Sequence, residues 1–535
     1  MSETYDAVVV GGGTAGCVVA ARLSEDAARR VLLLEAGPDY ATRADLPPAL
    51  ADVRYVPMRG HFADPDPRHD WGLLAVGKDG SAISVPQGRT IGGGSAINGS
   101  ISLRGATADY REWAEGGMPD WDWEPVLEAF IALEDDTAGG PDIHGRGGPW
   151  KIARSHEQEY GRLQAAFVDT CRASGQPDAW DLNAPDAHGV GPAPMSRCGT
   201  QRMSAADVYL NPVRSRPNLT VRGNTLVARV VLDGTRATGV ELADGTVIRA
   251  REVILCAGAI VTPALLQRSG VGPSALLEDL GISVVADRPV GDNLGDHFVV
   301  PLLAPPREGA WTPEDFSLQT ALRTSSSVQP GSLDIQLLMF TYLNVRTTGA
   351  AASSRGLAGQ ASADLDHVAG IGCVNNKPRA TGTVRISTTA PDALPRVEPN
   401  YLEDPIDRAV TAELVRLGWS VITAEPLRSL LHEPLGMDAE TVADDDALDA
   451  ALETRVASAY HFVGTARMGR ADDDRAVVDE EGRVHGLEGL RVIDASVIPR
   501  VPAANSMLPT LMVAERLAAA ARGREFGRAD VALRA

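Results

Sequence analysis

Short apolar runs and glycine-rich turns alternate along the first 37 residues of the chain. Residues 7–10 form a continuous apolar run, which is typical of a strand buried in a parallel sheet. Residues 11–16 read Gly-x-Gly-x-x-Gly, and the Ala- and Val-rich residues 17–23 then predict a helix. A second apolar run at residues 31–34 predicts a neighbouring strand, which ends at Glu35 about twenty residues after the glycines.

This strand, turn, helix and strand together predict a dinucleotide-binding site. Gly11 permits the tight turn, Gly13 lets the backbone approach a pyrophosphate, and Gly16 lets the helix pack closely on the strand. The N-terminus of the helix supplies N–H groups and a partial positive charge to the phosphates. Glu35 is predicted to accept hydrogen bonds from a ribose diol. A plain structural turn is the alternative, but it does not require the flanking strands and the terminal acid.

Residues 88–99 form a second glycine-rich segment, in which Ile91 and Ile97 bracket three consecutive glycines. Glycines let a backbone lie directly against a flat or charged ligand where a Cβ would clash, and their N–H groups can form an anion-binding nest. A flexible linker is the alternative, although linkers rarely bracket their glycines with isoleucines. The pattern favours a ligand-binding turn.

The rest of the chain alternates between helical and strand patterns. Helices are expected at 109–114, 125–131, 160–174, 262–268, 404–424 and 444–453, and a last helix has Pro509 in its first turn and ends near Arg522. Strands are expected at 219–221, 226–232, 239–242, 253–255, 333–340 and 382–387. The strand at 253–255 is wholly apolar and is expected to return to the central parallel sheet. Residues 38–80 lack periodicity and are expected to wrap over a site or a cofactor, and residues 346–362 are expected to form a mobile lid or to be poorly ordered.

Composition narrows the class of protein. The 535 residues are 44% hydrophobic and 23% charged, as in ordinary globular proteins, and the net charge of −21 argues against a nucleic-acid or anionic-membrane partner. Five scattered cysteines without Cys-x-x-Cys argue against a disulfide framework and a zinc site. The start of the chain has neither the charge nor the apolar run of a signal peptide, so a cytoplasmic enzyme is expected.

Three segments resemble signatures of the glucose–methanol–choline (GMC) oxidoreductases. Residues 258–272 are similar to the second signature throughout, and residues 88–98 are similar to the first, with a departure at Ser102. Residues 290–297 read Val-Gly-Asp-Asn-Leu-Gly-Asp-His and resemble the family's Val-Gly-x-Asn-Leu-x-Asp-His. The resemblance runs nearly end to end and is weakest between residues 301 and 370.

The resemblance implies an α/β fold that combines a Rossmann-type FAD-binding domain with a discontinuous substrate-binding domain built on an antiparallel sheet. The FAD-binding domain is expected to comprise residues 1–155, 201–300 and 455–535. The substrate-binding domain is expected to comprise residues 156–200 and 301–454.

The resemblance also implies a catalytic pair. His461 lies in His-x-x-Gly-Thr-x-Arg-Met-Gly and resembles the family's catalytic histidine, and Asn505 falls at the family's second catalytic position. Alcohol oxidation removes the hydroxyl proton and transfers a hydride from the carbon that bears the hydroxyl to flavin N5. A neutral imidazole is a suitable base for that proton. The amide of Asn505 can hold the substrate oxygen in line. Ile97 stands where some members tether the flavin through a histidine, so a non-covalent FAD is expected.

The remaining predicted site residues divide by ligand. Those expected to contact FAD are Gly11, Gly13, Thr14, Ala15, Gly16, Glu35, Ala36, Arg89, Gly93, Gly94, Asn98, Val227, Ala257, Asp494, Ala495, Asn505 and Leu508. Those expected to line the substrate pocket are Tyr460, Phe340 and Tyr342. His297 is expected to be structural, and His144 is expected to lie in a turn.

The predicted activity is FAD-dependent oxidation of an alcohol to a carbonyl compound. Residues 464–515 resemble most the branch that acts on primary hydroxymethyl groups of furans and on aryl alcohols, and a sugar or glycoside oxidase is the alternative within the family. A hydroxynitrile lyase shares the fold and keeps FAD as a structural element, whereas the intact pair disfavours a non-catalytic flavin-binding protein. The expected partners are a small-molecule alcohol and an electron acceptor, either oxygen or another molecule.

Overall fold

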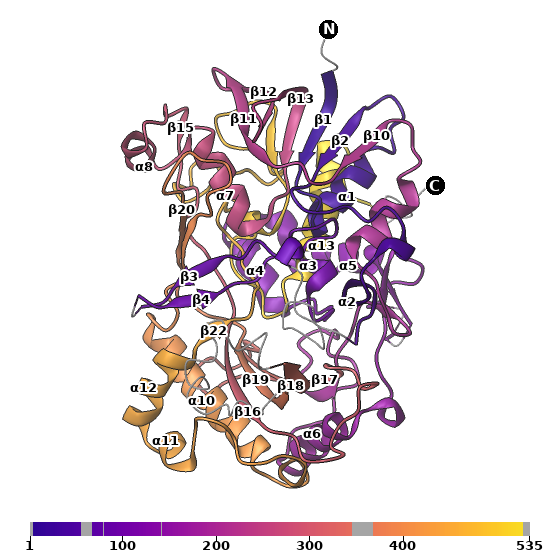
Figure 1. Ribbon diagram of the computed structural model, residues 1–535, viewed down its shortest axis with the longest axis vertical. Coiled ribbons are helices and arrows are strands. Elements are labelled where there is room, and N and C mark those ends of the chain that lie inside the picture. The colour runs from indigo at the N-terminus through magenta and orange to yellow at the C-terminus, as the bar shows by residue number, and fades with distance from the viewer. Residues whose placement is uncertain are drawn as a thin grey trace.

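The computed structural model describes residues 4–54, 67–78, 80–137, 139–140, 142–344 and 367–527. Its two parts are stacked along the long axis, with β1 and its neighbours in the upper part and β16 to β19 in the lower part (Figure 1). None of its helices is long and apolar enough to span a membrane within these ranges. The predicted lid at residues 346–362 lies outside the described residues.

The upper part is organised around a seven-stranded sheet in the order β10-β2-β1-β13-β12-β11, with β23 paired to β13. Its strands are β1 (Thr4–Val10), β2 (Val31–Leu34), β10 (Leu219–Arg222), β11 (Val227–Asp233), β12 (Arg236–Leu242), β13 (Val247–Leu255) and β23 (Leu490–Val492). The pairs that involve β1, β2, β10 and β23 are parallel, and β11 and β12 add an antiparallel edge. The apolar runs of the central parallel strands, residues 7–10, 31–34 and 253–255, are buried, as predicted.

Helix α1 (Thr14–Leu23) follows β1 and packs against α13 (Met507–Ala521), so the first and last long helices lie side by side (Figure 1). The Arg22 guanidinium joins them, because it donates two hydrogen bonds of 2.8 Å to the buried carboxylate of Glu515. The other helices of this part are α2 (Pro48–Ala51), α3 (Gly94–Ile97), α4 (Thr107–Glu115), α5 (Trp123–Leu133), α7 (Gly258–Arg268) and α8 (Ser274–Asp279).

The lower part contains an antiparallel six-stranded sheet in the order β22-β16-β19-β18-β17-β7. Its strands are β7 (Gly189–Pro192), β16 (Phe298–Ala304), β17 (Thr320–Thr324), β18 (Ile335–Asn344), β19 (His367–Asn375) and β22 (Ala457–Ser458). Helices α6 (Arg162–Ala173) and α10 (Pro405–Ile422) pack on this sheet. The approach of α10 is close, since a Cβ at Gly418 would lie 2.4 Å from Cys373 Sγ. Helices α11 (Ala439–Ala443) and α12 (Asp445–Arg455) complete this part.

Smaller sheets accompany the two large ones. β3 (Leu74–Val76), β4 (Ala82–Ser84), β20 (Thr383–Arg385) and β21 (Arg396–Glu398) form a four-stranded sheet. The two-stranded pairs are β5 (Glu134–Asp136) with β6 (Trp150–Ile152), β8 (Arg197–Cys198) with β9 (Gln201–Arg202), and β14 (Val271–Gly272) with β15 (Ala286–Asp287).

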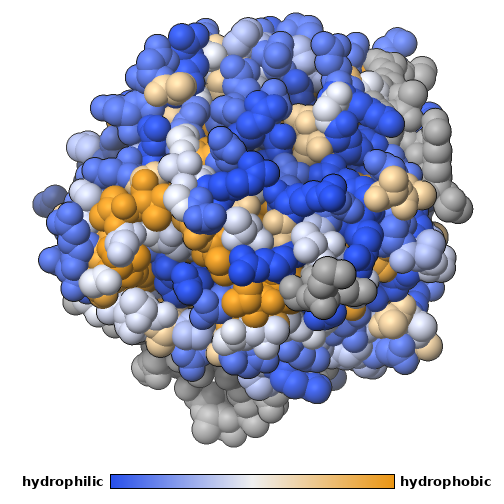
Figure 2. Space-filling view, turned by 90° about the horizontal axis from the view of Figure 1, so that it is seen from above, coloured by the Kyte–Doolittle hydropathy of each residue, from blue (hydrophilic) through white to orange (hydrophobic). Residues whose placement is uncertain are grey.

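The architecture confirms the predicted fold class, a mixed α/β fold with a discontinuous antiparallel unit. The lower sheet takes its strands from three separate stretches, residues 189–192, 298–375 and 457–458. The exact domain boundaries stay a prediction. The surface seen from above is mostly hydrophilic, with hydrophobic residues in smaller groups, as suits a chain with a net charge of −21 (Figure 2).

Candidate active site

A cavity runs from the carboxyl ends of the parallel strands to the inner face of the lower sheet. In open α/β sheets, ligands bind outside these strand ends, which is where the sequence predicts a dinucleotide. Trp71, from the loop expected to wrap over a site, also lines the cavity. The predicted site residues that line it are Gly11, Gly13, Thr14, Ala15, Glu35, Ala36, Gly93, Gly94, Asn98, Val227, Ala257, Asp494, Ala495, Asn505, His461, Tyr460 and Phe340.

The two glycine-rich turns meet at the upper end of the cavity. Gly93 has a φ of 50°, and a Cβ there would lie 2.7 Å from Gly13 Cα. Gly16 does not line the cavity, but a Cβ there would lie 1.9 Å from Gly11 O, so it allows α1 to approach β1. Thr14 begins α1 and lines the cavity, so the helix N-terminus faces the space where phosphates are expected.

Glu35 stabilises the first turn. Its Oε2 accepts a hydrogen bond from Gly12 N and its Oε1 accepts one from Gly37 N, each at 2.8 Å. Burial raises the pKa of this carboxyl, although the backbone donors oppose the shift. Each oxygen keeps a further lone pair. The predicted contact with a ribose diol stays a prediction.

Asp494 connects the end of β23 to the first turn of α7. Its Oδ2 accepts hydrogen bonds from Gly258 N at 2.8 Å and Thr262 Oγ1 at 2.6 Å, and its Oδ1 accepts one from Ser496 N at 2.8 Å. Burial raises the pKa of this carboxyl. Asp494 therefore holds together the backbone of the cavity wall that includes Ala257 and Ala495.

The predicted catalytic pair meets at the other end of the cavity. Asn505 Nδ2 lies 3.1 Å from His461 Nε2, although 44 residues separate them. Asn505 lies just before α13, and His461 lies in the loop after β22, in which Tyr460 takes a φ of 68°. The His461 backbone N–H donates to Asp296 Oδ1 at 2.8 Å, which fixes the loop. The structure thus places the imidazole of His461 and the amide of Asn505 side by side in the cavity wall, and their catalytic roles stay a prediction.

A second histidine lies behind the first. His297 Nδ1 is 3.0 Å from His461 Nδ1, and the two rings meet edge to face at 77°. His297 Nε2 is 2.9 Å from Pro502 O, and the residue is fully buried. The sequence predicts a structural residue here but does not reveal this contact. The Asp-His ending of residues 290–297 was the available signal, but it does not say which side chain lies opposite.

The wall next to the catalytic pair is apolar. It includes Val299 from β16, Leu338 and Phe340 from β18, and Val374 from β19. Tyr342 was also expected here but does not line the cavity; its hydroxyl donates to Arg54 O at 3.0 Å. The reason is a register shift in β18 after Phe340, which breaks the alternation that would place both aromatic rings on one face.

Two residues predicted to contact the cofactor also lie away from the cavity surface. The Arg89 guanidinium lies 5.2 Å from the centre of the Trp71 ring, and Leu508 is fully buried in the first turn of α13. Both lie next to residues that do line the cavity, Gly88 and Met507. A direct contact with FAD stays a prediction for them.

The residues present fit FAD. The cavity offers a helix N-terminus, two turns without Cβ atoms, and a continuous path from Glu35 to His461. Ile97 lines the cavity at the position where a tether is expected in some members, and its side chain has no nucleophilic atom. These observations support a non-covalent cofactor.

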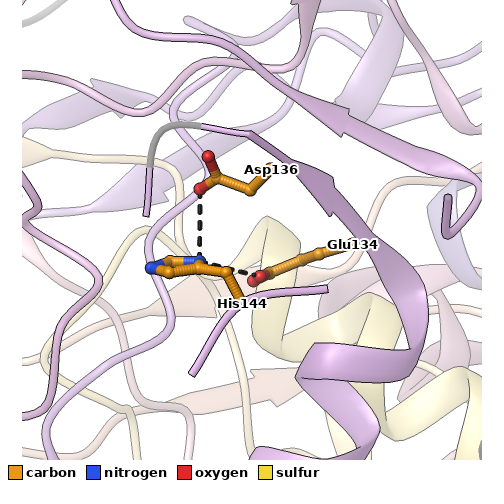
Figure 3. Close-up of side chains that lie close together, drawn as sticks. All are labelled: Glu134, Asp136 and His144. Carbon is orange, nitrogen blue, oxygen red and sulfur yellow. Dashed lines mark hydrogen bonds and ion pairs between the residues drawn. The ribbon is translucent and has the colours of Figure 1, made fainter. Parts of the chain in front are cut away.

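Glu134, Asp136 and His144 form a group of possible metal ligands, whose ligand atoms lie within 4.8 Å of one another (Figure 3). His144 Nδ1 is 3.3 Å from a carboxylate oxygen of each acid, and His144 Nε2 is 2.7 Å from Asp181 Oδ2. The expectation of a turn residue was incomplete, because His144 is buried at the centre of an ion network.

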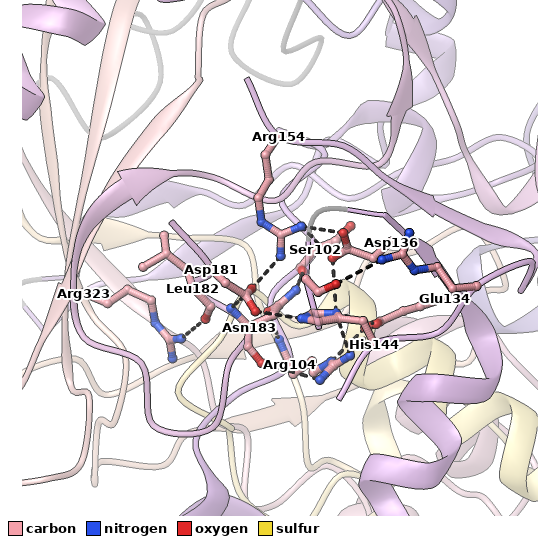
Figure 4. A network of polar contacts seen from close by, with 12 residues as sticks. Ser102, Arg104, Glu134, Asp136, His144, Arg154, Asp181, Leu182, Asn183 and Arg323 are labelled. Atoms are coloured by element: carbon pink, nitrogen blue, oxygen red, sulfur yellow. Dashed lines mark hydrogen bonds and ion pairs between the residues drawn. The ribbon is translucent and has the colours of Figure 1, made fainter. Parts of the chain in front are cut away.

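Two arginines already occupy these carboxylates (Figure 4). Arg104 donates to Glu134, and Arg154 Nη1 lies 2.6 Å from the Asp136 carboxylate. Burial lowers the pKa of the imidazole, but its hydrogen bonds to Asp181 and Glu134 outweigh burial and raise it above its usual value. With the imidazole protonated, three positive groups face three carboxylates, so the geometry is that of a neutralised ion network.

Comparisons with known proteins agree with the signatures. Models of a family described as GMC oxidoreductase match residues 5–299 and residues 378–514. An alignment 551 positions long shows 37% identity to 5-(hydroxymethyl)furfural oxidase of Methylovorus sp. (strain MP688), and it covers 97% of this chain and 99% of that protein. An alignment 545 positions long shows 32% identity to oxygen-dependent choline dehydrogenase of Photobacterium profundum, with coverage of 98% and 94%.

The fold has a solved counterpart of nearly equal extent. The crystal structure of pyridoxine 4-oxidase from Mesorbium loti aligns with a TM-score of 0.85 at 28% identity. The alignment covers 98% of this chain and 100% of that one. The resemblance inferred from the signatures is therefore confirmed over nearly the whole chain.

Proposed function

The chain belongs to the GMC oxidoreductase family, so it is an FAD-dependent oxidoreductase of CH–OH groups, and we propose that it oxidises primary hydroxymethyl groups, in particular those on aromatic rings. The observation that supports this proposal is the distance of 3.1 Å between His461 Nε2 and Asn505 Nδ2, next to an apolar wall. Two relatives named for hydroxymethylfurfural and pyridoxine point to the same substrate class.

The polarity of the cavity favours an uncharged, ring-shaped alcohol. Among the described lining residues, Glu35 and Asp494 are the acidic ones, and both are engaged with backbone N–H groups. A trimethylammonium substrate would be favoured by an unpaired acid, which these lining residues do not offer, and a sugar would need several polar partners. Leu338, Phe340 and Val374 offer apolar contact instead.

Each group beside the reacting carbon has a separate role. His461 Nε2 takes the hydroxyl proton, a step that typically contributes about 10²–10⁴-fold. Asn505 holds the alcohol oxygen in line, since its amide can both donate and accept. The apolar wall excludes water from the reacting carbon. When bound, FAD supplies the hydride acceptor. We propose that Gly13, Thr14 and Gly93 would hold its phosphates.

An anaerobic alcohol panel tests the proposal. The yellow holoprotein is mixed with 5-hydroxymethylfurfural, benzyl alcohol, choline or glucose, and the flavin absorbance is followed. The furan or the benzyl alcohol should bleach it fastest, and faster bleaching by choline or glucose would contradict the proposed substrate class. No bleaching, with cyanide released from a cyanohydrin, would identify a lyase. Addition of oxygen or an artificial acceptor to the bleached protein then identifies the acceptor class.

A variant tests the assigned base. His461→Ala should keep bound FAD yet lose most of the flavin reduction by alcohol. His485→Leu is the matched control, because His485 Nε2 donates to a backbone carbonyl, Gly469 O, away from the cavity. Reduction of His461→Ala at the wild-type rate would refute the assignment.

A further inference from the structure

The Nδ1 atom of His297 faces the Nδ1 atom of His461. The backbone of residues 295–297 pairs with the backbone of residues 459–463, since Ala459 N donates to His297 O at 2.9 Å and Gly295 N donates to Val463 O at 3.0 Å. This pairing places the two Nδ1 atoms 3.0 Å apart. One of the two nitrogens must carry the hydrogen and the other must accept it.

The carbonyl of Pro502 decides which nitrogen donates. Pro502 O can only accept, so the contact of 2.9 Å requires a hydrogen on His297 Nε2. A neutral imidazole has one N–H, so His297 Nδ1 is then an acceptor. His461 must donate from its Nδ1, which leaves a lone pair on His461 Nε2. That atom faces Asn505 Nδ2, a donor, at 3.1 Å, so every contact in the chain is satisfied.

The opposite arrangement leaves two conflicts. With the hydrogen on His297 Nδ1, the bare Nε2 would face the lone pairs of Pro502 O. His461 would then carry its hydrogen on Nε2 and point it at the amide donor of Asn505. The amide could rotate, but the carbonyl cannot change from acceptor to donor.

Pro502 O is itself held firmly. Lys377 Nζ donates to Val501 O at 3.1 Å, and Arg323 Nη2 donates to Ala503 O at 2.7 Å. Ala503 N donates to the buried carboxylate of Asp109 at 2.7 Å. Three side chains from separate parts of the chain therefore fix the residues on both sides of Pro502, and the same segment leads directly into Asn505.

The surroundings keep His297 neutral. Burial lowers its pKa to about 3, although hydrogen bonding to the backbone of Pro502 and Asn376 opposes the shift, and the positive charge of Lys377 adds to the lowering. Asp296 precedes His297 in the chain, and its carboxyl group accepts from His461 N, Ser458 Oγ and the Tyr401 hydroxyl rather than from the His297 ring. His297 therefore does not compete for the proton that His461 receives.

From this geometry we infer that His297 is a positioning residue that fixes His461 in the Nδ1–H tautomer and so presents its Nε2 lone pair to the substrate. His297 does not touch the substrate; it acts through His461. Once the His461 ring is charged, its Nδ1–H donates a stronger hydrogen bond to His297 Nδ1, which stabilises the imidazolium. The inference rests on the proposed role of His461 as base, but the tautomer can be measured without turnover.

The first test is spectroscopic and uses the resting holoprotein labelled with ¹⁵N-histidine. The signals of His461 are assigned by their loss in His461→Gln, and their two-bond correlations report which nitrogen carries the hydrogen. The wild-type protein should show the Nδ1–H form at pH 8. An Nε2–H form in the wild-type protein would overturn the inference, whether or not any alcohol is oxidised.

Two substitutions then separate positioning from structure. His297→Asn keeps an oxygen acceptor near the place of Nδ1, whereas His297→Leu fills the space without one. The leucine variant should reduce its flavin roughly 10- to 100-fold more slowly with FAD still bound. Its pH profile should shift down by about one unit, because the imidazolium has lost its acceptor. The asparagine variant should recover the rate and the profile.

The outcomes are decisive for either variant. A leucine variant with the wild-type rate, pH profile and tautomer would overturn the inference. If that variant does not bind FAD, the asparagine variant decides alone: a retained Nδ1–H signal supports the inference, and its loss overturns it. His485→Leu serves as the control for removing a histidine from a backbone carbonyl outside the cavity.

Discussion

Asp296 Oδ1 accepts a hydrogen bond of 2.8 Å from the backbone N–H of His461. Its other oxygen, Oδ2, accepts from Ser458 Oγ at 2.6 Å and from the Tyr401 hydroxyl. Despite these donors, burial raises the pKa of this carboxyl to about 7. The loop that carries the proposed base therefore rests on a carboxyl that titrates near neutral pH.

Asp296→Asn should flatten the dependence of thermal stability on pH. Because the folded pKa is above the unfolded value near 3.9, the folded protein binds this proton more tightly. The stabilising contribution is complete below about pH 4 and is lost as the pH rises through about 7. Between pH 5 and pH 8, the wild-type protein should lose about 3 kcal/mol that the variant does not lose. Calorimetry over this range measures the slopes, and parallel slopes would contradict the prediction.

Arg22→Met should destabilise the protein by about 3–5 kcal/mol, because it leaves the buried carboxylate of Glu515 without its guanidinium. The double variant Arg22→Met, Glu515→Leu should recover most of the loss, since both charges are then gone. Denaturant unfolding of the holoprotein measures the free energies.

The matched control for this ion pair is Arg236→Met. Arg236 and Glu488 lie 2.8 Å apart, but their side chains are 58% and 70% exposed. Loss of this pair should cost less than about 1 kcal/mol. Equal losses from the buried and the exposed pair would refute the assigned role of Arg22.

His144→Leu should remove a fall in stability that the wild-type protein shows as the pH rises past the pKa of His144. The pKa is raised in the folded state, so the contribution of the imidazolium is complete below about pH 6.5 and is lost above the folded pKa. Melting temperatures between pH 5 and pH 9 should fall more steeply for the wild type than for the variant. Addition of Zn²⁺ or Mn²⁺ should change neither curve, and a metal-dependent rise would indicate a metal site instead.

Gly94→Ala should fold like the wild type yet bind FAD at least about tenfold more weakly. No protein atom lies within 4 Å of the added methyl group, and alanine suits the helix α3. The methyl group would instead occupy the cavity where the cofactor is expected. FAD titration of the apoprotein measures affinity, with Gly140→Ala as the control because it also has open space. Unchanged affinity would place FAD away from Gly94.

Acid precipitation should release the flavin into the supernatant. Ile97 lines the cavity and cannot form a covalent bond to the isoalloxazine. A pellet that stays yellow after washing would contradict a non-covalent cofactor.

Local pattern was sufficient to predict the elements that are proposed to hold the nucleotide. The apolar runs at residues 7–10 and 31–34 form adjacent parallel strands, and the spacing of the glycines predicted the turn and the start of α1. Helix α7 begins four residues earlier than expected, at Gly258 rather than Thr262. The strands, the turn and the approximate positions of the helices are predictable because hydrophobic periodicity and turn chemistry act over a few residues.

Strand alternation failed where the backbone departs from regular geometry. Phe340 lines the cavity as expected, but the register shift that follows turns Tyr342 toward Arg54. A bulge depends on the neighbouring strand, and the residues of one strand do not encode it alone.

The sequence by itself determined the class of protein, because its nucleotide turn and its family signatures are contiguous. Only the tertiary structure decided which groups face one another. His297 meets His461 across 164 residues, Asp109 reaches Ala503 across 394, and His144 lies among acids and arginines rather than in a simple turn. Such contacts depend on how the whole chain folds, so the hydrogen-bond partners, burial and tautomer of a side chain are defined only in the folded protein.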